Sequence, residues 1–151
     1  MVNERTVVQA RPLDPDDAEA LAAIDLRDAA RTGRAPALNR GALAFYGRSG
    51  HAFTAWRDGT PQGFALAQAV WDGDQATVRL ATLALADASD HEVRAALLEA
   101  VTKSAYDAAV YALAADVPDA DPEARALFEA AGWRPLAARP YRRTLGSRGT
   151  P

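Results

Sequence analysis

The sequence predicts a mixed α/β domain with a mostly antiparallel sheet flanked by helices. Two observations predict this class. Residues 51–87 contain three apolar runs separated by Asp58-Gly59 and Asp72-Gly73, which are turn pairs typical of β-hairpins. Directly afterwards, apolar residues recur at three- and four-residue spacing over residues 88–108, as in a helix that packs on a sheet. The 151 residues suffice for one such domain and hardly for two.

The first part of the chain predicts one strand and two helices. Residues 5–13 form the strand, and residues 14–30 form a helix with Asp14 as its N-cap and Pro15 in its first turn. Residues 38–50 form a second, short helix, for which Asn39 is a suitable cap.

The remaining elements complete the sheet. The run from residue 63 to residue 71 is almost wholly apolar and predicts a central strand covered on both faces. After the long helix, residues 110–117 predict another strand, and residues 121–133 predict a short helix with Gly132 at its C-terminus. Residues 134–146 predict a final strand or hairpin. The domain therefore spans residues 1–146, and residues 147–151 form a loose tail.

The composition argues against a nucleic-acid-binding, metal-binding or membrane protein. The formal net charge is −3 and the pI is about 5.3, so no overall basic field favours a nucleic-acid partner. The chain has no cysteine, and its only histidines, His51 and His91, are far apart in sequence, so we expect no metal site. No apolar run approaches about 18 residues and no leader peptide begins the chain, which favours a cytoplasmic protein without membrane association.

The order of elements and the segment "DPEARALFEAAGW" resemble the GNAT family, the N-acetyltransferases that use acetyl-CoA. The short helix of that family reads Asn-x-x-Ala-x-x-Leu-Tyr-x-x-x-Gly-Phe. Here Asp121 stands at the asparagine position and Phe128 at the tyrosine position. Four further residues match in place or kind: Ala124, Leu127, Gly132 and Trp133. The resemblance covers essentially the whole chain, and "GFALAQAVW" and "VTKSAYDAAVY" resemble stretches of an uncharacterised, divergent bacterial group of GNAT-like proteins.

The resemblance implies a single-domain GNAT fold with acetyl-CoA as cosubstrate. Two parallel central strands, residues 76–86 and 110–115, would splay apart and admit the pantetheine arm. Backbone groups near Leu83 and Leu85 would pair with the pantetheine amides. The acceptor would be a small-molecule or peptide amine, and family habit implies a homodimer through a sheet edge or the C-terminal hairpin.

The turn into the long helix departs from the family pattern. The family places Arg/Gln-x-x-Gly-x-Gly/Ala there, because glycines let the backbone approach the pyrophosphate at the helix N-terminus. In this chain Ser89 takes the first position, and Glu92 and Arg94 take the two glycine positions. Ser89-x-x-Glu92 predicts a capping box, and Asp90 with Glu92 would repel phosphate. Arg94 either reaches a phosphate or faces solvent and pairs with Asp90.

The acid and base of the reaction are not identified by the sequence. Phe128 cannot protonate a leaving thiolate, and the alternatives are Tyr46 and Tyr141. His51 and His91 are the candidate bases, although each also suits a surface or capping position.

Three interpretations stay open. The chain is an N-acetyltransferase with a degenerate phosphate turn, or a catalytically inactive GNAT-fold module for binding or protein interaction, or an unrelated α/β domain. A further hypothesis concerns arginines around the first helix break, which would bind an acidic or phosphorylated ligand or would only be solvated: Arg31, Arg34, Arg40 and Arg48.

Overall fold

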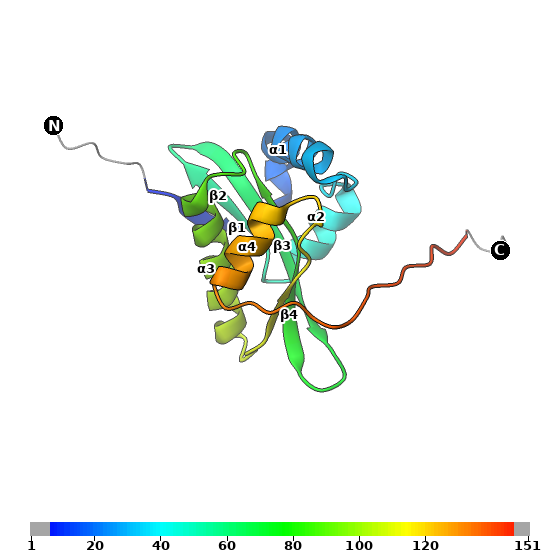
Figure 1. The fold of residues 1–151 in the computed structure, drawn as a ribbon. Coiled ribbons are helices and arrows are strands. Elements are labelled where there is room, and N and C mark those ends of the chain that lie inside the picture. Colours follow the sequence, from blue (N-terminus) through cyan, green and yellow to red (C-terminus); the bar gives the residue numbers. More distant parts are fainter. Residues whose placement is uncertain (1–6, 147–151) are drawn as a thin grey trace. The chain divides into compact units, whose positions relative to one another are not determined.

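The computed structural model describes residues 7–146, which divide between Asp121 and Pro122 into two compact units. The first unit contains a five-stranded sheet (Figure 1). The strands lie in the order β1-β2-β3-β4-β5, with bounds β1 (Gln9–Pro12), β2 (Phe53–Arg57), β3 (Thr60–Trp71), β4 (Ala76–Leu85) and β5 (Leu113–Ala115). The first four strands pair antiparallel, and β5 runs parallel to β4. The predicted mixed, mostly antiparallel sheet is confirmed.

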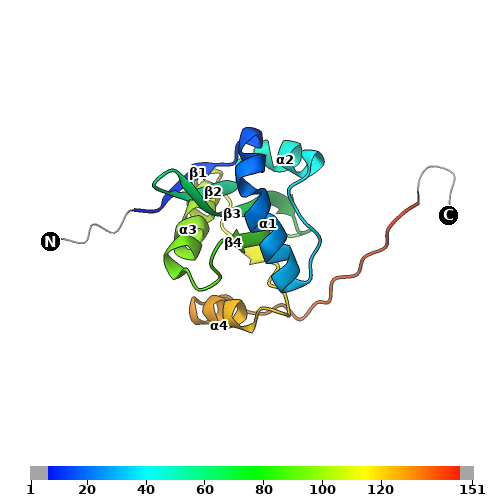
Figure 2. The same cartoon turned by 90° about the horizontal axis from the view of Figure 1, so that it is seen from above.

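Helices cover both faces of this sheet (Figure 2). The first two are α1 (Ala18–Thr32), preceded by the short 3₁₀ turn η1 (Pro15–Asp17), and α2 (Arg40–Gly47). They lie on one face, and α3 (His91–Asp107) lies on the other. The second unit contains α4 (Pro122–Ala130). Among the described residues no helix is long and apolar enough to cross a membrane.

The predicted caps Asp14 and Asn39 are found at η1 and α2, whereas Asp17, the N-cap of α1, makes no side-chain cap bond. The Asp14 side chain accepts a hydrogen bond from the Asp16 amide at 2.9 Å, and Asn39 Oδ1 accepts one from the Ala42 amide at 2.8 Å. Each bond satisfies an N–H that has no partner inside the helix.

The β2–β3 connection is the predicted two-residue hairpin. Asp58 and Gly59 both have positive φ, 51° and 70°, as a type I′ turn requires. Arg57, at the end of β2 beside this turn, lies next to the start of α3, where it contacts Asp90.

The core has two layers, one on each side of β3. Phe64 and Leu66 are fully buried against Leu21 and Leu43, which come from α1 and α2. On the other face, Gly63 lies so close to α3 that a Cβ added there would be 3.3 Å from Leu97 Cδ1. Side chains therefore alternate between the two helical layers along β3.

Two predictions about the strands need correction. Only residues 63–67 of β3 are buried, because the strand continues past the helices, and Trp71 at its end is 72% exposed. β5 is also shorter than the predicted strand of residues 110–117.

The predicted final strand or hairpin is wrong. Residues 134–146 contain no regular secondary structure, and their side chains are exposed. Pro135 and Pro140 have no N–H to donate to a strand pair, and four arginines in this segment favour water over a buried face. The predicted tail, residues 147–151, lies outside the described residues. The described part of the chain therefore contains no C-terminal hairpin through which a homodimer could form.

Candidate functional site

The central feature of the site is the place where β4 and β5 part. At the two ends of their ladder, the Val78 amide donates to the Ala112 carbonyl and the Asp116 amide donates to the Leu80 carbonyl, each at 2.9 Å. The β4–β5 ladder covers only Val78–Leu80, while β4 continues to Leu85. Within residues 7–121, no strand pairs with the β5 side of β4 beyond Leu80. The end of β4 therefore has an open edge.

A β-bulge lies at the same point. Leu80 is opposite Ala67 and Thr82 is opposite Leu66, so Ala81 is an extra residue in β4. Bulges bend a strand and change its twist, which turns the end of β4 away from β5.

The pairing of β4 with β3 beyond the bulge shows which backbone groups of β4 face the open edge. The Ala86 amide donates to the Gln62 carbonyl of the neighbouring chain segment at 2.8 Å. In an antiparallel pair, every second residue directs its N–H and C=O groups to the same side. Leu85 and Leu83 therefore direct theirs away from β3 and toward the open edge.

The turn into α3 is not the predicted capping box. Asp90, not Ser89, is the N-cap, and its Oδ1 accepts from the Val93 amide at 3.1 Å. The hydroxyl and the amide of Ser89 both donate to Asp87 Oδ1, at 2.7 and 2.9 Å. Asp87 thus captures both donors of Ser89 in a local turn, and Asp90, an equally good cap, begins the helix.

Arg57, which no sequence motif points to, offsets part of the negative charge of this turn. Arg57 Nη1 lies 3.0 Å from Asp90 Oδ2, and Nη2 lies 3.3 Å from Glu92 Oε2. Burial acts to raise the pKa of Asp90, but bonds from Arg57 and the Val93 amide outweigh it and hold that pKa below its ordinary value. No sequence signal links Arg57 to residues more than 30 positions away.

Arg94 is buried, so the prediction of a solvent-facing arginine paired with Asp90 is wrong. Only 6% of the residue is exposed. Its Nη2 donates to the Ala88 carbonyl at 3.0 Å, and Nη1 lies 3.4 Å from His91 Nδ1. Its Nε is buried and has no hydrogen-bond partner among residues 7–146. The unpaired Nε–H is a donor that could still bind an acceptor. Leaving it unpaired in a buried position costs free energy.

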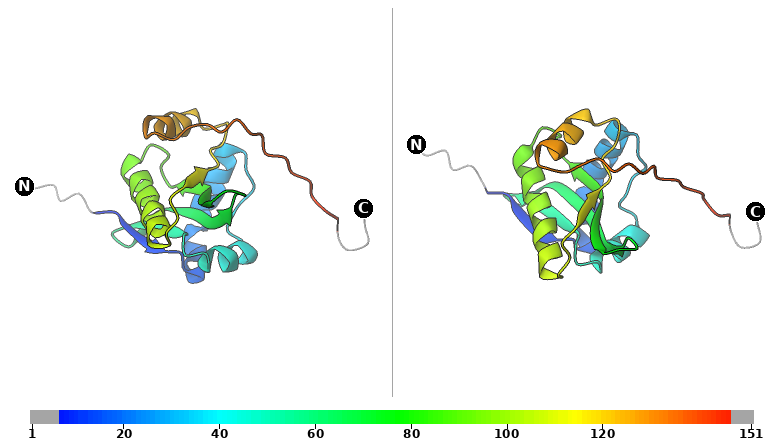
Figure 3. Two further views of the ribbon diagram at one scale, coloured as in Figure 1. Left: turned by 90° about the horizontal axis from the view of Figure 1, so that it is seen from below. Right: turned by 60° about the horizontal axis from the view of Figure 1, so that its bottom comes forward.

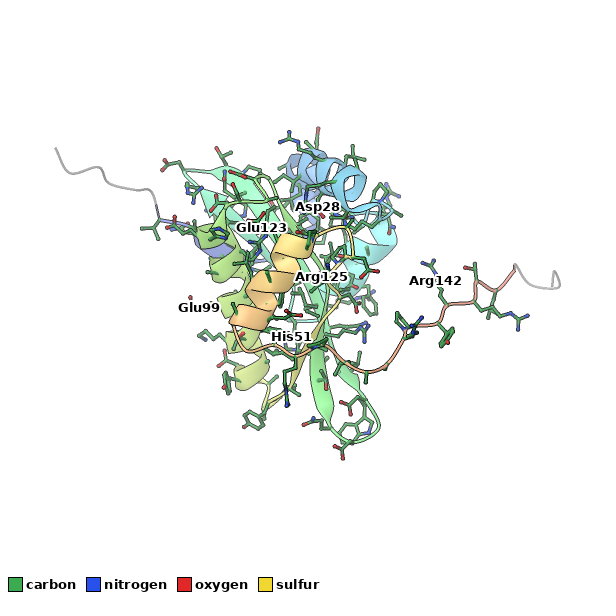
Figure 4. The ribbon with its side chains drawn as sticks, viewed as in Figure 1. Asp28, His51, Glu99, Glu123, Arg125 and Arg142 are labelled. Atoms are coloured by element: carbon green, nitrogen blue, oxygen red, sulfur yellow. The ribbon has the colours of Figure 1, made fainter. Side chains whose placement is uncertain are left out.

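Asp121 belongs to an ion-pair network with the first helix. Its Oδ2 lies 3.0 Å from Arg31 Nη1, and Arg31 Nη2 lies 2.9 Å from Asp28 Oδ1. Burial acts to lower the pKa of Arg31, but the bonds from Asp28 and Asp121 outweigh it and raise that pKa. Figure 4 shows Asp28 on α1.

The four arginines around the first helix break therefore do not form one anion site. Arg31 is engaged in the network just described, and Arg34 is bound by Asp25 and Asp28 at 2.8 and 2.9 Å. Arg40 and Arg48 stand at opposite ends of the eight-residue helix α2.

Among the candidate acids and bases, His51 is buried on the α3 side of the sheet. Its Nδ1 lies 2.9 Å from Ser104 Oγ, and burial lowers its pKa. The ring is labelled in Figure 4. His91 is exposed in the first turn of α3. No group of three His, Asp or Glu side chains in residues 7–146 is arranged to hold a metal ion.

The aromatic candidates are distributed over both units. Tyr46 lies on α2, and its pKa is raised by burial and then by the charge of Asp116. In the second unit, Phe128 packs edge to face on Trp133, with ring centroids 4.9 Å apart. Tyr141 is 94% exposed in the segment that follows α4, which is drawn in Figure 3.

Known proteins resemble this chain over nearly its whole length. Residues 8–142 match the model of a family described as a protein of unknown function, DUF1999. No curated protein matches the sequence significantly. The protein TTHA1254 from Thermus thermophilus is 36% identical; the match covers 93% of this chain and 99% of that one, with a TM-score of 0.71 for the wild type.

More distant solved structures are acetyltransferases. The aminoglycoside N-acetyltransferase AAC(6')-Iy, in complex with CoA, has a TM-score of 0.75 at 16% identity and covers 95% of this chain and 99% of its own. Ribosomal-protein-alanine N-acetyltransferase from Brucella melitensis biovar Abortus 2308 has a TM-score of 0.70 at 16% identity, with coverage of 93% and 100%. At such identities the likeness establishes the fold alone. The chain therefore belongs to the DUF1999 family and has the GNAT acetyltransferase fold.

Proposed function

We propose that this protein is an acyl-CoA-dependent N-acetyltransferase that modifies an amine. The observation that carries the proposal is the open edge of β4 beyond Leu80, with the backbone groups of Leu83 and Leu85 directed at it. These groups match the amides of a pantetheine arm, which can pair with a strand edge as another strand would. The structural neighbour AAC(6')-Iy in complex with CoA supports this use of the fold.

The chain's own residues fit the phosphates of acetyl-CoA. The backbone amides in the first turn of α3 lie at the positive end of the helix dipole. Arg94, with its unpaired Nε, supplies a fixed cation beside that turn. Arg57 offsets part of the repulsion that Asp90 and Glu92 would exert. In the GNAT pattern, glycines let the backbone approach the pyrophosphate. In this chain, the buried Arg94 and the Arg57–Asp90 ion pair would take over that role.

Two further residues stand at family positions for the cofactor. Asp121 takes the place of the family's asparagine, and its carboxylate is oriented by Arg31. Phe128, in the second unit, takes the place of the tyrosine and has an apolar ring without a hydroxyl. When bound, acetyl-CoA would supply an activated acetyl group: the amide C–N bond forms, the C–S bond breaks, the amine loses a proton and the thiolate gains one.

The test is calorimetric titration of acetyl-CoA into the wild type and the Arg94→Gln variant. We expect the variant to weaken binding of acetyl-CoA about tenfold or more, since one charge-assisted contact to phosphate is lost. Acetyl-pantetheine, which lacks the pyrophosphate, should bind both proteins equally. Arg27→Gln, on the exposed side of α1, is the matched control. The absence of both binding heat and a thermal shift at millimolar acetyl-CoA would refute the proposal.

A second candidate, a catalytically inactive binding or interaction module, is favoured by Phe128. The ring at this position has no hydroxyl and packs on Trp133. Loss of a general acid typically lowers a rate by about 10²–10⁴-fold. Binding of acetyl-CoA without acetyl transfer to any member of an amine library would favour this candidate. Thiol release that depends on one added amine would exclude it.

A further inference from the structure

An ion pair crosses β4 and β5 at the point where the strands part. Arg79 Nη2 lies 2.6 Å from Asp116 Oδ1, and Arg79 Nε lies 3.3 Å from Asp116 Oδ2. Asp116 directly follows β5, and its amide makes the last backbone bond to β4, at Leu80. The pair therefore stands at the inner end of the open edge.

The pair lies on the α1/α2 face of the sheet. Arg79 is opposite Gln68 on β3, and residues directly opposite each other share a face. Gln68 is two positions from Leu66, whose side chain packs in the core beneath α1 and α2. Thr82, opposite Leu66, lies on the same face one step beyond the bulge.

Tyr46 adds a third polar group from the helix above this face. It packs at the edge of the same core cluster, and the negative charge of Asp116 contributes to raising its pKa. The core residues beside this group fix its position, while the pair itself stays accessible, with exposed side-chain fractions of 45% for Arg79 and 53% for Asp116.

We propose that Arg79, Asp116 and Tyr46 form the acceptor subsite, and that it takes an amino-acid-like zwitterion, a primary amine that also carries a carboxylate. This inference rests on the proposed acetyl transfer. A carboxylate of the ligand pairs with the planar guanidinium of Arg79, and its ammonium group pairs with Asp116. Exposed ion pairs contribute little to stability, so replacing this internal pair by two ligand contacts costs little.

The charge of the subsite argues against polycationic acceptors. A site for several ammonium groups needs a surplus of carboxylates, whereas here one arginine stands directly beside one aspartate. Like-charge repulsion by Arg79 would disfavour a second ammonium group close to the first. We therefore expect aminoglycosides, which AAC(6')-Iy is named for, to be poor acceptors.

The test compares amino acids with their decarboxylated amines in calorimetric titrations, with CoA present and absent. The pairs are L-lysine with cadaverine and L-phenylalanine with phenethylamine. In the wild type, we expect each amino acid to bind about tenfold or more tightly than its amine. Arg79→Gln should bring the two affinities within about twofold of each other, and Asp116→Asn should weaken both ligands about tenfold.

The controls are Arg27→Gln and Asp107→Asn, two exposed charges on α1 and α3, which should leave every affinity unchanged. Equal binding of amine and amino acid by the wild type, or affinities that ignore both substitutions, overturns the inference, as does the absence of any binding. Binding of acetyl-CoA without amino-acid binding leaves the proposed function intact and refutes only this subsite. Amino-acid binding that depends on Arg79 and Asp116, without acetyl-CoA binding, supports the subsite and refutes the acetyltransferase.

Discussion

Arg57, the last residue of β2, donates a hydrogen bond to the carboxylate of Asp90, the residue that caps α3, with Nη1 3.0 Å from Oδ2. This contact joins the β2–β3 hairpin to the start of the helix that covers the sheet. It also leaves Asp90 with two functions, because its other oxygen binds the Val93 amide. The turn into α3, which lacks the glycines of the GNAT pattern, is therefore held by side chains.

Removal of the Asp90 side chain should destabilise the protein. Asp90→Ala loses both the cap and the partner of Arg57, and loss of an N-cap alone typically costs about 1 kcal/mol. We expect a decrease of about 1–2 kcal/mol in the free energy of unfolding, measured by urea denaturation. Asp90→Asn, which keeps a capping oxygen, should cost less than Asp90→Ala. Equal losses in the two variants would show that the ion pair, and not the cap, is the important contact.

Removal of the Glu92 charge should strengthen binding of CoA. Glu92 is in the first turn of α3, and its side chain is 54% exposed and bound only at 3.3 Å by Arg57. Glu92→Gln removes one negative charge near the proposed phosphates, so we expect a several-fold lower Kd at low salt and a smaller gain at high salt. Glu92→Gly should have the same direction, at some cost in helix stability. An unchanged Kd in both variants would mean that this turn does not face the cofactor.

Gly63 should not tolerate a side chain. A Cβ at this position would lie 2.6 Å from the Ala84 carbonyl oxygen and 3.3 Å from Leu97 Cδ1. Because the first neighbour is backbone of the adjacent strand, Gly63→Ala should destabilise the protein by about 1–3 kcal/mol, as measured by thermal or urea denaturation. The matched control is Gly47→Ala, where the new Cβ makes an ordinary contact at 3.7 Å with Pro15. A neutral Gly63→Ala would mean that β3 and β4 can separate locally.

His51 should make stability depend on pH in the acidic range. Burial lowers its folded-state pKa below the ordinary value of 6.5, so the unfolded chain binds more protons between these two values. The free energy of unfolding should therefore fall as the pH decreases from 6.5 toward the folded pKa, and this contribution should be constant above 6.5. His51→Gln should reduce this slope in denaturation curves recorded across the pH range. A slope that is identical in the variant would assign it to other groups.

Local signals in the sequence were sufficient wherever a short stretch decides its own structure. Asp14 and Asn39 cap helices as expected, because capping needs only the side chain and the following amides. The Asp58-Gly59 turn was predictable for the same reason, since both residues tolerate positive φ. At Ser89 the local prediction was wrong, because Asp87 binds the hydroxyl and amide of Ser89 while Asp90 accepts from the Val93 amide and caps the helix.

The order of the elements as far as α4, the hairpins of the central sheet and the apolar stripe of α3 could be predicted from the sequence, because each depends on periodicity and turn chemistry within a few residues. The folded structure was needed to show that Arg57 pairs with Asp90 before α3, that Arg94 is buried, and that Arg79 meets Asp116 where the strands part. These contacts join residues on different elements. Their geometry follows from strand register and the β4 bulge, which no local pattern specifies.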